Sequence, residues 1–175
     1  MSVSISSINY CPVKSISFQN IGDCKIRKNI GIVGDRVFAF SKGLEFNQAQ
    51  LFEKNLDERR GKWNKILTLK NSPVLNKYNF KLKDNKLTFT LRNNEILTID
   101  VSKTGEHKLL SNKILELENS LGKPIFLMKN LETPFFDTSI SNKTVLTHSI
   151  SLLNNKSIKD FEKKKNQTIE NQRFR

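Results

Sequence analysis

The sequence contains few of the residues that build metal centres and disulfide frameworks. Of its 175 residues, two are cysteines, Cys11 and Cys24, and two are histidines. The cysteines do not form a CxxC pair, and no histidine-rich cluster lies near them. Structural zinc sites need several such ligands at close spacing, so the sequence predicts no zinc site. Both thiols are expected to be reduced, as is usual in cytosolic proteins.

Long apolar runs are also absent. No stretch approaches the roughly 20 apolar residues that a membrane-spanning helix requires. The opening MSVSISSINY lacks the basic region and the apolar stretch of a signal peptide. We therefore expect a cytoplasmic protein with no membrane partner. With 37% hydrophobic residues, the chain can build one core or two small ones, which argues against a wholly disordered protein.

Acidic residues are outnumbered. The chain has 30 Lys and Arg against 17 Asp and Glu, a net charge of +13, which suits an anionic ligand or partner. Lys is much commoner than Arg, and Asn and Ile are abundant, a composition also typical of AT-rich genomes. The lysines scatter among predicted loops and hairpins, whereas nucleic-acid grooves place aromatic and Arg side chains along one surface. A basic β-barrel that binds nucleic acid therefore remains only an alternative.

The first hundred residues predict mainly β-structure. The clearest signal is a meander, in which three segments alternate with period two and are separated by Asp84-Asn85 and Asn93-Asn94, residues that tolerate tight hairpin turns. The charged segment 50–62 fits either a short helix or an ordered loop. The predicted strands cover residues 3–8, 24–28, 36–40, 63–69, 78–82, 87–91, 96–101, 123–129 and 144–147.

Two helices are predicted. Residues 106–121 carry an apolar stripe at helical spacing and are followed by Gly122 and Pro124, which stop a helix. Residues 154–165 place lysines at their C-terminal end, where cations interact favourably with the helix dipole. These elements predict an α+β fold that is mostly β, with a barrel-like domain over residues 1–126 and the beginning of a second domain over 127–175.

Three short clusters carry side chains suited to an anion. They are Pro12-Val13-Lys14-Ser15, the turn from Gly31 to Asp35-Arg36, and Thr147-His148-Ser149 taken together with the terminal Arg173-Phe174-Arg175. Lys, Arg and hydroxyl groups at separate strand ends supply the charge and the donors that a phosphate or a polyanionic cofactor needs. Taken singly, each has a simpler interpretation: a structural ion pair for Asp35 and Arg36, a surface lysine for Lys14, and a structural histidine for His148.

In this order, the motifs resemble those of the MOSC-domain proteins, the molybdenum cofactor sulfurase C-terminal-like family, whose MOSC β-barrel follows an N-terminal β-barrel domain. The family includes reductases of N-hydroxylated compounds. The resemblance implies a site for the molybdenum cofactor (Mo-molybdopterin), a small-molecule substrate and an external electron donor. The implied cofactor ligands are Lys14, Ser15 and Arg36 for the pterin and its phosphate, Thr147 and His148 for polar contacts, and Arg175 as a further guanidinium.

The sequence departs from the family pattern at three places. Cys11 stands where an aromatic residue or His is usual, and Ala49 stands where relatives often carry Arg. The metal-ligating cysteine of the family would follow Arg175, so the chain is expected to be truncated and inactive, with its catalytic residue unknown. The intact protein is expected to be an oxidoreductase. The alternative is a non-catalytic module that carries the cofactor or a sulfur derived from it.

Overall fold

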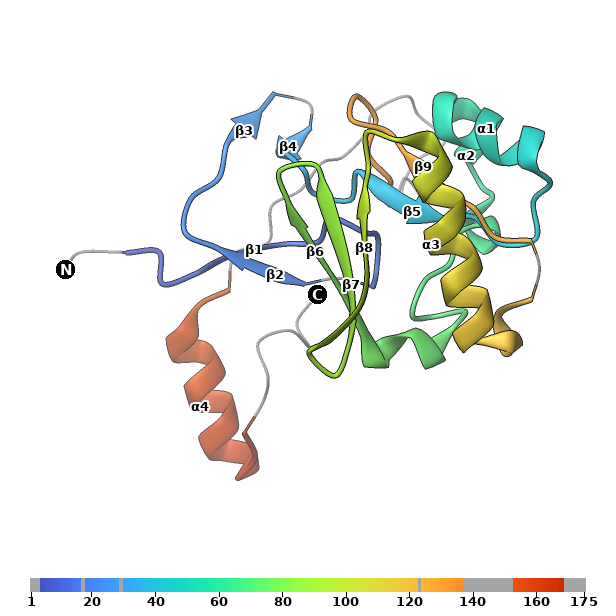
Figure 1. Cartoon of the computed structure of the whole chain (residues 1–175). Coiled ribbons are helices and arrows are strands. Elements are labelled where there is room, and N and C mark those ends of the chain that lie inside the picture. The colour runs from blue at the N-terminus through green and yellow to red at the C-terminus, as the bar shows by residue number, and fades with distance from the viewer. Residues whose placement is uncertain (1–3, 17, 29, 123, 137–152, 169–175) are drawn as a thin grey trace.

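A three-stranded antiparallel meander forms the largest sheet of the computed structural model, which describes residues 4–16, 18–28, 30–122, 124–136 and 153–168 (Figure 1). Its strands are β6 (Tyr78–Lys83), β7 (Lys86–Leu91) and β8 (Asn94–Asp100). The hairpin turns contain left-handed residues at Asp84, Arg92 and Asn93. The predicted meander is therefore confirmed, because its period-two pattern and its turn residues are both local properties of the sequence.

The remaining strands pair in three small antiparallel sheets, and the described residues do not form a closed barrel. Helices and 3₁₀ turns together hold more residues than strands. The α+β class is thus confirmed, while the predominance of β-structure is not. The pairs are β1 (Ile8–Tyr10) with β2 (Gln19–Ile21), β3 (Ile26–Arg27) with β4 (Gly31–Ile32), and β5 (Phe38–Phe40) with β9 (Leu127–Lys129).

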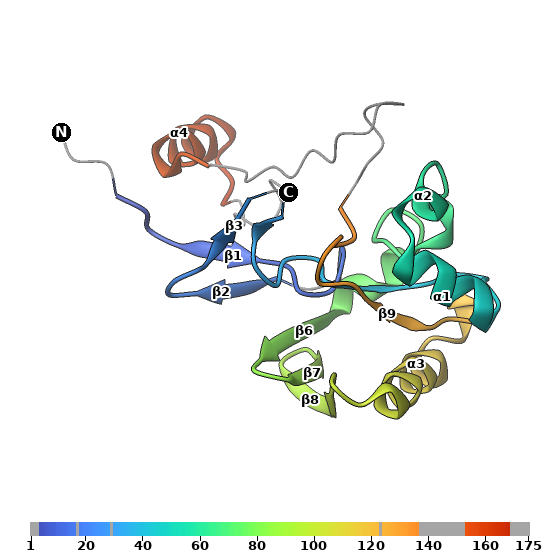
Figure 2. The same cartoon turned by 90° about the horizontal axis from the view of Figure 1, so that it is seen from above.

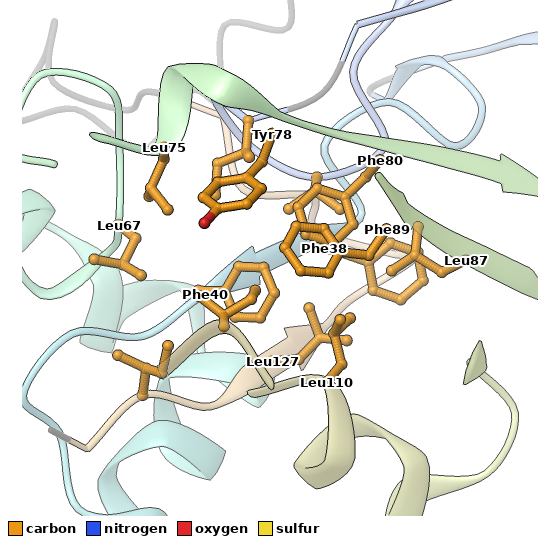
Figure 3. Close-up of a cluster of buried hydrophobic side chains, with 14 of the residues drawn as sticks. Phe38, Phe40, Leu67, Leu75, Tyr78, Phe80, Leu87, Phe89, Leu110 and Leu127 are labelled. Atoms are coloured by element: carbon orange, nitrogen blue, oxygen red, sulfur yellow. The ribbon is translucent and has the colours of Figure 1, made fainter. Parts of the chain in front are cut away.

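Strand β5 separates two hydrophobic cores. Phe38 and Phe40 enter the larger core, whereas Ala39 between them enters the smaller one, since successive side chains of a strand point to opposite faces. Figure 3 shows the larger core between the meander, β5 and the helix α3 (Thr104–Leu117). There Phe80 stacks on Phe89 with ring centroids 4.8 Å apart. The smaller core unites Ala39, Leu44, Ala49, Phe52, Ile66, Met128 and Phe135.

Helices surround these sheets. The segment 50–62, for which the sequence left helix and loop open, is largely helical, because it contains most of α1 (Phe46–Lys54) and all of α2 (Leu56–Arg59). Figures 1 and 2 show α4 (Asn155–Lys165) at the opposite end of the molecule from α1 and α2. In the described part of the chain, no helix is both long and apolar enough to span a bilayer. Besides α3, the helices are α1 (Phe46–Lys54), α2 (Leu56–Arg59) and α4 (Asn155–Lys165), and the 3₁₀ turns are η1 (Trp63–Lys65), η2 (Pro73–Lys77) and η3 (Asn119–Leu121).

Both predicted helices are present, with one correction. Helix α4 begins after Asn154, whose side chain accepts a hydrogen bond from the Lys156 amide at 2.9 Å. The predicted helix 106–121 is broken instead, since α3 ends at Leu117 and η3 follows. The break lies at Glu118, whose backbone leaves the helical region with φ −133° and ψ 75°. Its side chain there meets Tyr78 and Lys77, contacts that distant segments impose.

Several predicted strands are shorter than expected. Of residues 63–69, only Ile66 forms a bridge, with Ser41, and η1 precedes it. Ile66 and Leu67 are both fully buried, so this segment lies within the cores instead of alternating across a sheet. The strand predicted at 144–147 lies outside the described residues. The domain boundary at residue 126 stays a prediction, although β9, directly after it, pairs with β5.

A buried carboxylate connects the end of α3 to the meander. Glu118 accepts a hydrogen bond from the Tyr78 hydroxyl and forms an ion pair with Lys77. Burial acts to raise the pKa of Glu118, but the hydrogen bonds and charge of its partners outweigh burial and lower it. The pKa of Tyr78 is raised by burial and by this carboxylate. Glu118 is therefore held as the anion.

We expect Glu118→Gln to lower the free energy of unfolding at pH 7 by about 1–3 kcal/mol, because a charged hydrogen bond is replaced by a neutral one. The folded state lowers this pKa, so the contribution is complete above the ordinary value of 4.5 and is lost as the pH falls through the folded-state pKa. Urea denaturation at pH 7 and at about pH 3 measures both effects. The matched control is Glu116→Gln, which changes an exposed glutamate in the last turn of α3, two residues before Glu118. Equal losses for the two variants would contradict this assignment.

Candidate functional site

The segment 11–14 lies beside β5 and the residues that precede it. Val13 forms a parallel bridge with Phe38, whose amide donates to the Pro12 carbonyl at 3.0 Å and whose carbonyl accepts from the Lys14 amide at 2.8 Å. The Arg36 amide donates to the Cys11 carbonyl at 2.6 Å. These backbone hydrogen bonds place residues 11–14 beside residues 36–38, although the two segments are far apart in sequence.

The turn from Gly31 to Arg36 is shaped by left-handed backbone. Gly31, Gly34 and Arg36 have φ values of 85°, 91° and 54°. A Cβ atom on Gly34 would lie 3.2 Å from the Tyr10 ring, so any other residue there would have to displace that ring and also adopt a left-handed backbone. Arg36 itself adopts a conformation that costs energy for a residue other than glycine. The sequence predicted a strand from residue 36. The left-handed conformation of Arg36 explains why β5 begins only at Phe38.

Asp35 holds the two segments together. Its side chain is mostly buried, and its Oδ1 accepts a hydrogen bond from the Cys11 amide at 2.7 Å. Its other oxygen, Oδ2, forms an ion pair with the Arg36 guanidinium. Burial first, and then the charge of Asp35, raise the pKa of the neighbouring Tyr10. The carboxylate therefore acts as a structural joint between residues 11 and 36.

The Arg36 guanidinium is aligned from two sides. Its Cζ lies 5.0 Å from the centroid of the Phe136 ring, and its Nη1 contacts Asp35. About a third of the Arg36 side chain remains exposed (34%). A guanidinium over an aromatic face keeps its in-plane donors for other acceptors. This geometry suits a cation that binds an oxyanion.

The predicted residues of the first loop differ in exposure. Lys14 is buried, with 3% of its surface exposed, and Ser15 is half-buried in a left-handed conformation with φ 64°. The thiol of Cys11 is also buried and donates to the Val13 carbonyl at 3.1 Å. Of the predicted cofactor ligands, the structure thus brings Lys14, Ser15 and Arg36 to neighbouring loops. Thr147, His148 and Arg175 lie outside the described residues.

Two residues that shape the candidate site were not predicted from the sequence. Phe136 covers Arg36, and Arg59 holds the segment that carries Phe136. The sequence signal for the first was an aromatic pair, Phe135-Phe136, in an otherwise polar stretch. Arg59 lay within a run of charged residues, and nothing in that run distinguishes it from its exposed neighbour Arg60.

The donor set suits an anion more than a metal ion. Within the described ranges, no group of three or more His, Cys, Asp and Glu residues could hold a metal. Lys14, Ser15 and Arg36 instead carry ammonium, hydroxyl and guanidinium groups, which are the kinds of group that bind phosphate oxygens. No protein-family model, curated protein or solved structure matches the chain. A functional assignment therefore depends on this donor set and its geometry.

We expect Asp35→Ala to lower the free energy of unfolding by about 1–3 kcal/mol, because it leaves the buried Cys11 amide without its acceptor. Asp35→Asn keeps an oxygen at that position and should cost less. Urea denaturation of the two variants beside the wild type tests this expectation. If the Asn variant is destabilised as much as the Ala variant, the Cys11 hydrogen bond is not what joins the two segments.

Proposed function

We propose that this chain binds the molybdenum cofactor through the loops that carry Lys14, Ser15 and Arg36. The observation that carries the proposal is the set of backbone hydrogen bonds joining residues 11–14 to residues 36–38, which places the segment leading to Lys14 and Ser15 beside the segment that begins with Arg36. The pterin and its phosphate are the anionic, hydrogen-bonding parts of that cofactor. Paired cations offset the cost of removing such an anion from water.

Each residue has a distinct part in this proposal. The partly exposed Arg36 binds the phosphate through the guanidinium edge that Asp35 leaves open. Ser15 donates its hydroxyl, and Lys14 supplies positive charge from the interior of the loop. Thr147 and His148 add polar contacts and Arg175 adds a second guanidinium, as the family resemblance implies. The surrounding architecture would be that of an N-terminal β-barrel domain and the start of a MOSC domain.

When bound, the cofactor supplies the redox chemistry, in which an N-hydroxylated small molecule is reduced with electrons from an external donor. The residues described here bind and orient the cofactor. The Cys11 thiol is committed to the Val13 carbonyl inside the loop. The proposed reductase activity also needs the metal-ligating cysteine of the family. We therefore propose a cytoplasmic reductase only for an intact protein that includes this cysteine.

A non-catalytic cofactor carrier is the second candidate. It requires only the groups for the phosphate and pterin that the site carries, and no metal-ligating cysteine. A carrier retains the cofactor without turnover, whereas a reductase converts an amidoxime when a reduced electron donor is supplied. An amidoxime reduction assay on cofactor-loaded protein therefore separates the two candidates.

The binding proposal is tested by measuring pterin in the purified full chain after production in cells that make the cofactor. The fluorescent oxidised pterin reports the organic part, and elemental analysis reports molybdenum. We expect near-stoichiometric pterin in the wild type and a roughly tenfold lower content in Arg36→Ala, because a charge-assisted contact to the phosphate is lost.

The matched control is Arg92→Ala. Arg92 is exposed in the hairpin between β7 and β8 and shares the left-handed backbone of Arg36, with φ 48°. The two variants therefore change the same residue type in the same backbone conformation, and only Arg36 lies at the site. Pterin absent from the wild type, or equally reduced in both variants, would refute the proposal.

Cys11 should be dispensable for cofactor retention. Its thiol is buried and bonded to the Val13 carbonyl, so it does not face a ligand of Arg36. We expect Cys11→Ser to retain the wild-type pterin content, since a hydroxyl can make the same hydrogen bond. Loss of molybdenum from this variant with pterin retained would identify Cys11 as a metal ligand, contrary to this assignment.

A further inference from the structure

Arg59 is a buried cation whose side-chain hydrogen bonds, among the described residues, all go to one loop segment. It ends α2 and has 2% of its surface exposed. Nη1 donates to the carbonyls of Thr133 at 2.8 Å and Pro134 at 3.4 Å, and Nη2 donates to Thr133 Oγ1 at 2.5 Å. Burial lowers the pKa of Arg59 to about 10. In the described part of the chain, no carboxylate pairs with this guanidinium.

Such a group is costly to keep. Removing a guanidinium from water without a counterion is unfavourable, and the Nε of Arg59 has no hydrogen-bond partner in the described part of the chain. An apolar side chain of similar length could pack on the Phe135 ring, which lies 4.6 Å from Arg59 Cζ, without this cost. An apolar residue could not, however, donate hydrogen bonds to two successive carbonyls and a hydroxyl. These hydrogen bonds fix the backbone at residues 133–134.

That segment leads directly to the candidate site. The Phe135 amide donates to the Arg36 carbonyl at 2.8 Å, and the next ring, that of Phe136, covers the Arg36 guanidinium. At the other end of the segment, Asn130 Nδ2 donates to the Glu53 carbonyl at 2.5 Å. Residues 130–136 are thus held by α1 and α2 on one side and by the start of β5 on the other.

We propose that Arg59 is a positioning residue for Arg36: by holding Thr133 and Pro134, it keeps the Phe136 ring against the Arg36 guanidinium and so fixes the direction of that guanidinium. Arg59 itself touches no ligand in this arrangement. The link between the two arginines does not depend on which ligand the site binds. Its consequence for cofactor affinity rests on the proposed function.

Nuclear magnetic resonance measures this link directly. A proton over the face of an aromatic ring is shifted upfield by the ring current, so the Arg36 Nε–H signal reports the position of Phe136. In ¹⁵N-labelled full-length protein, the signal is assigned by its loss in Arg36→Lys. We expect Arg59→Met to move it towards the position of an exposed arginine, because all three hydrogen bonds to the segment are lost. Thr133→Val should move it less far in the same direction, because it removes only the hydrogen bond to the hydroxyl.

A matched control separates positioning from general destabilisation. Ile99→Val in β8 shortens a fully buried side chain of the larger core, away from the 130–136 segment. It should lower the melting temperature and leave the Arg36 signal in place. An unchanged Arg36 signal in folded Arg59→Met or Thr133→Val would overturn the proposal, as would an equal shift in Ile99→Val. If Arg59→Met does not fold, Thr133→Val decides alone.

Pterin content provides the second readout. Residues that orient a ligand-binding group, without touching the ligand, commonly change affinity by about tenfold or more, so a loss of this order is expected in Arg59→Met and none in Ile99→Val. If the wild type binds no pterin, the proposed function fails while the NMR shift still decides the positioning role. A moved Arg36 signal with wild-type pterin content would restrict the role of Arg59 to structure and overturn its part in binding.

Discussion

Strand β5 is the element on which the rest of the structure depends. It is buried on both faces, where it separates two hydrophobic cores, and it is paired on both edges, with Val13 on one side and β9 on the other. Phe40 also accepts a hydrogen bond from the Leu67 amide at 2.9 Å. A strand with both faces and both edges occupied leaves little freedom to the segments around it, so their positions are defined together.

The candidate site is a direct consequence of this burial. The residues before β5 must turn sharply to leave the interior, and the left-handed Arg36 lies in that turn. The partner on the Val13 edge continues into Lys14 and Ser15, and the partner on the other edge, β9, continues into the segment that contains Phe136. Three chain segments that pair with or lead into β5 thus carry Lys14, Arg36 and Phe136, and the Phe136 ring meets the Arg36 guanidinium.

Buried charged side chains form hydrogen bonds between segments of this fold that are distant in sequence. Asp35 links to the Cys11 amide, Glu118 to the Tyr78 hydroxyl, and Arg59 to a loop more than seventy residues away. Each of these groups costs desolvation energy, which hydrogen bonds offset only when the partner segments are correctly placed. Buried charges of this kind therefore favour one arrangement of the segments over alternatives of similar hydrophobic burial.

The sequence by itself determined the features that depend on neighbouring residues. The meander follows from alternation and turn residues, and α4 follows from a capping Asn154 and lysines at its end. The residue types at the site were also evident from the motifs. Only the tertiary structure decided where α3 ends, which charged residue of the 50–62 segment is buried, and which ring covers Arg36. These outcomes depend on contacts between distant segments, whose geometry local periodicity does not encode.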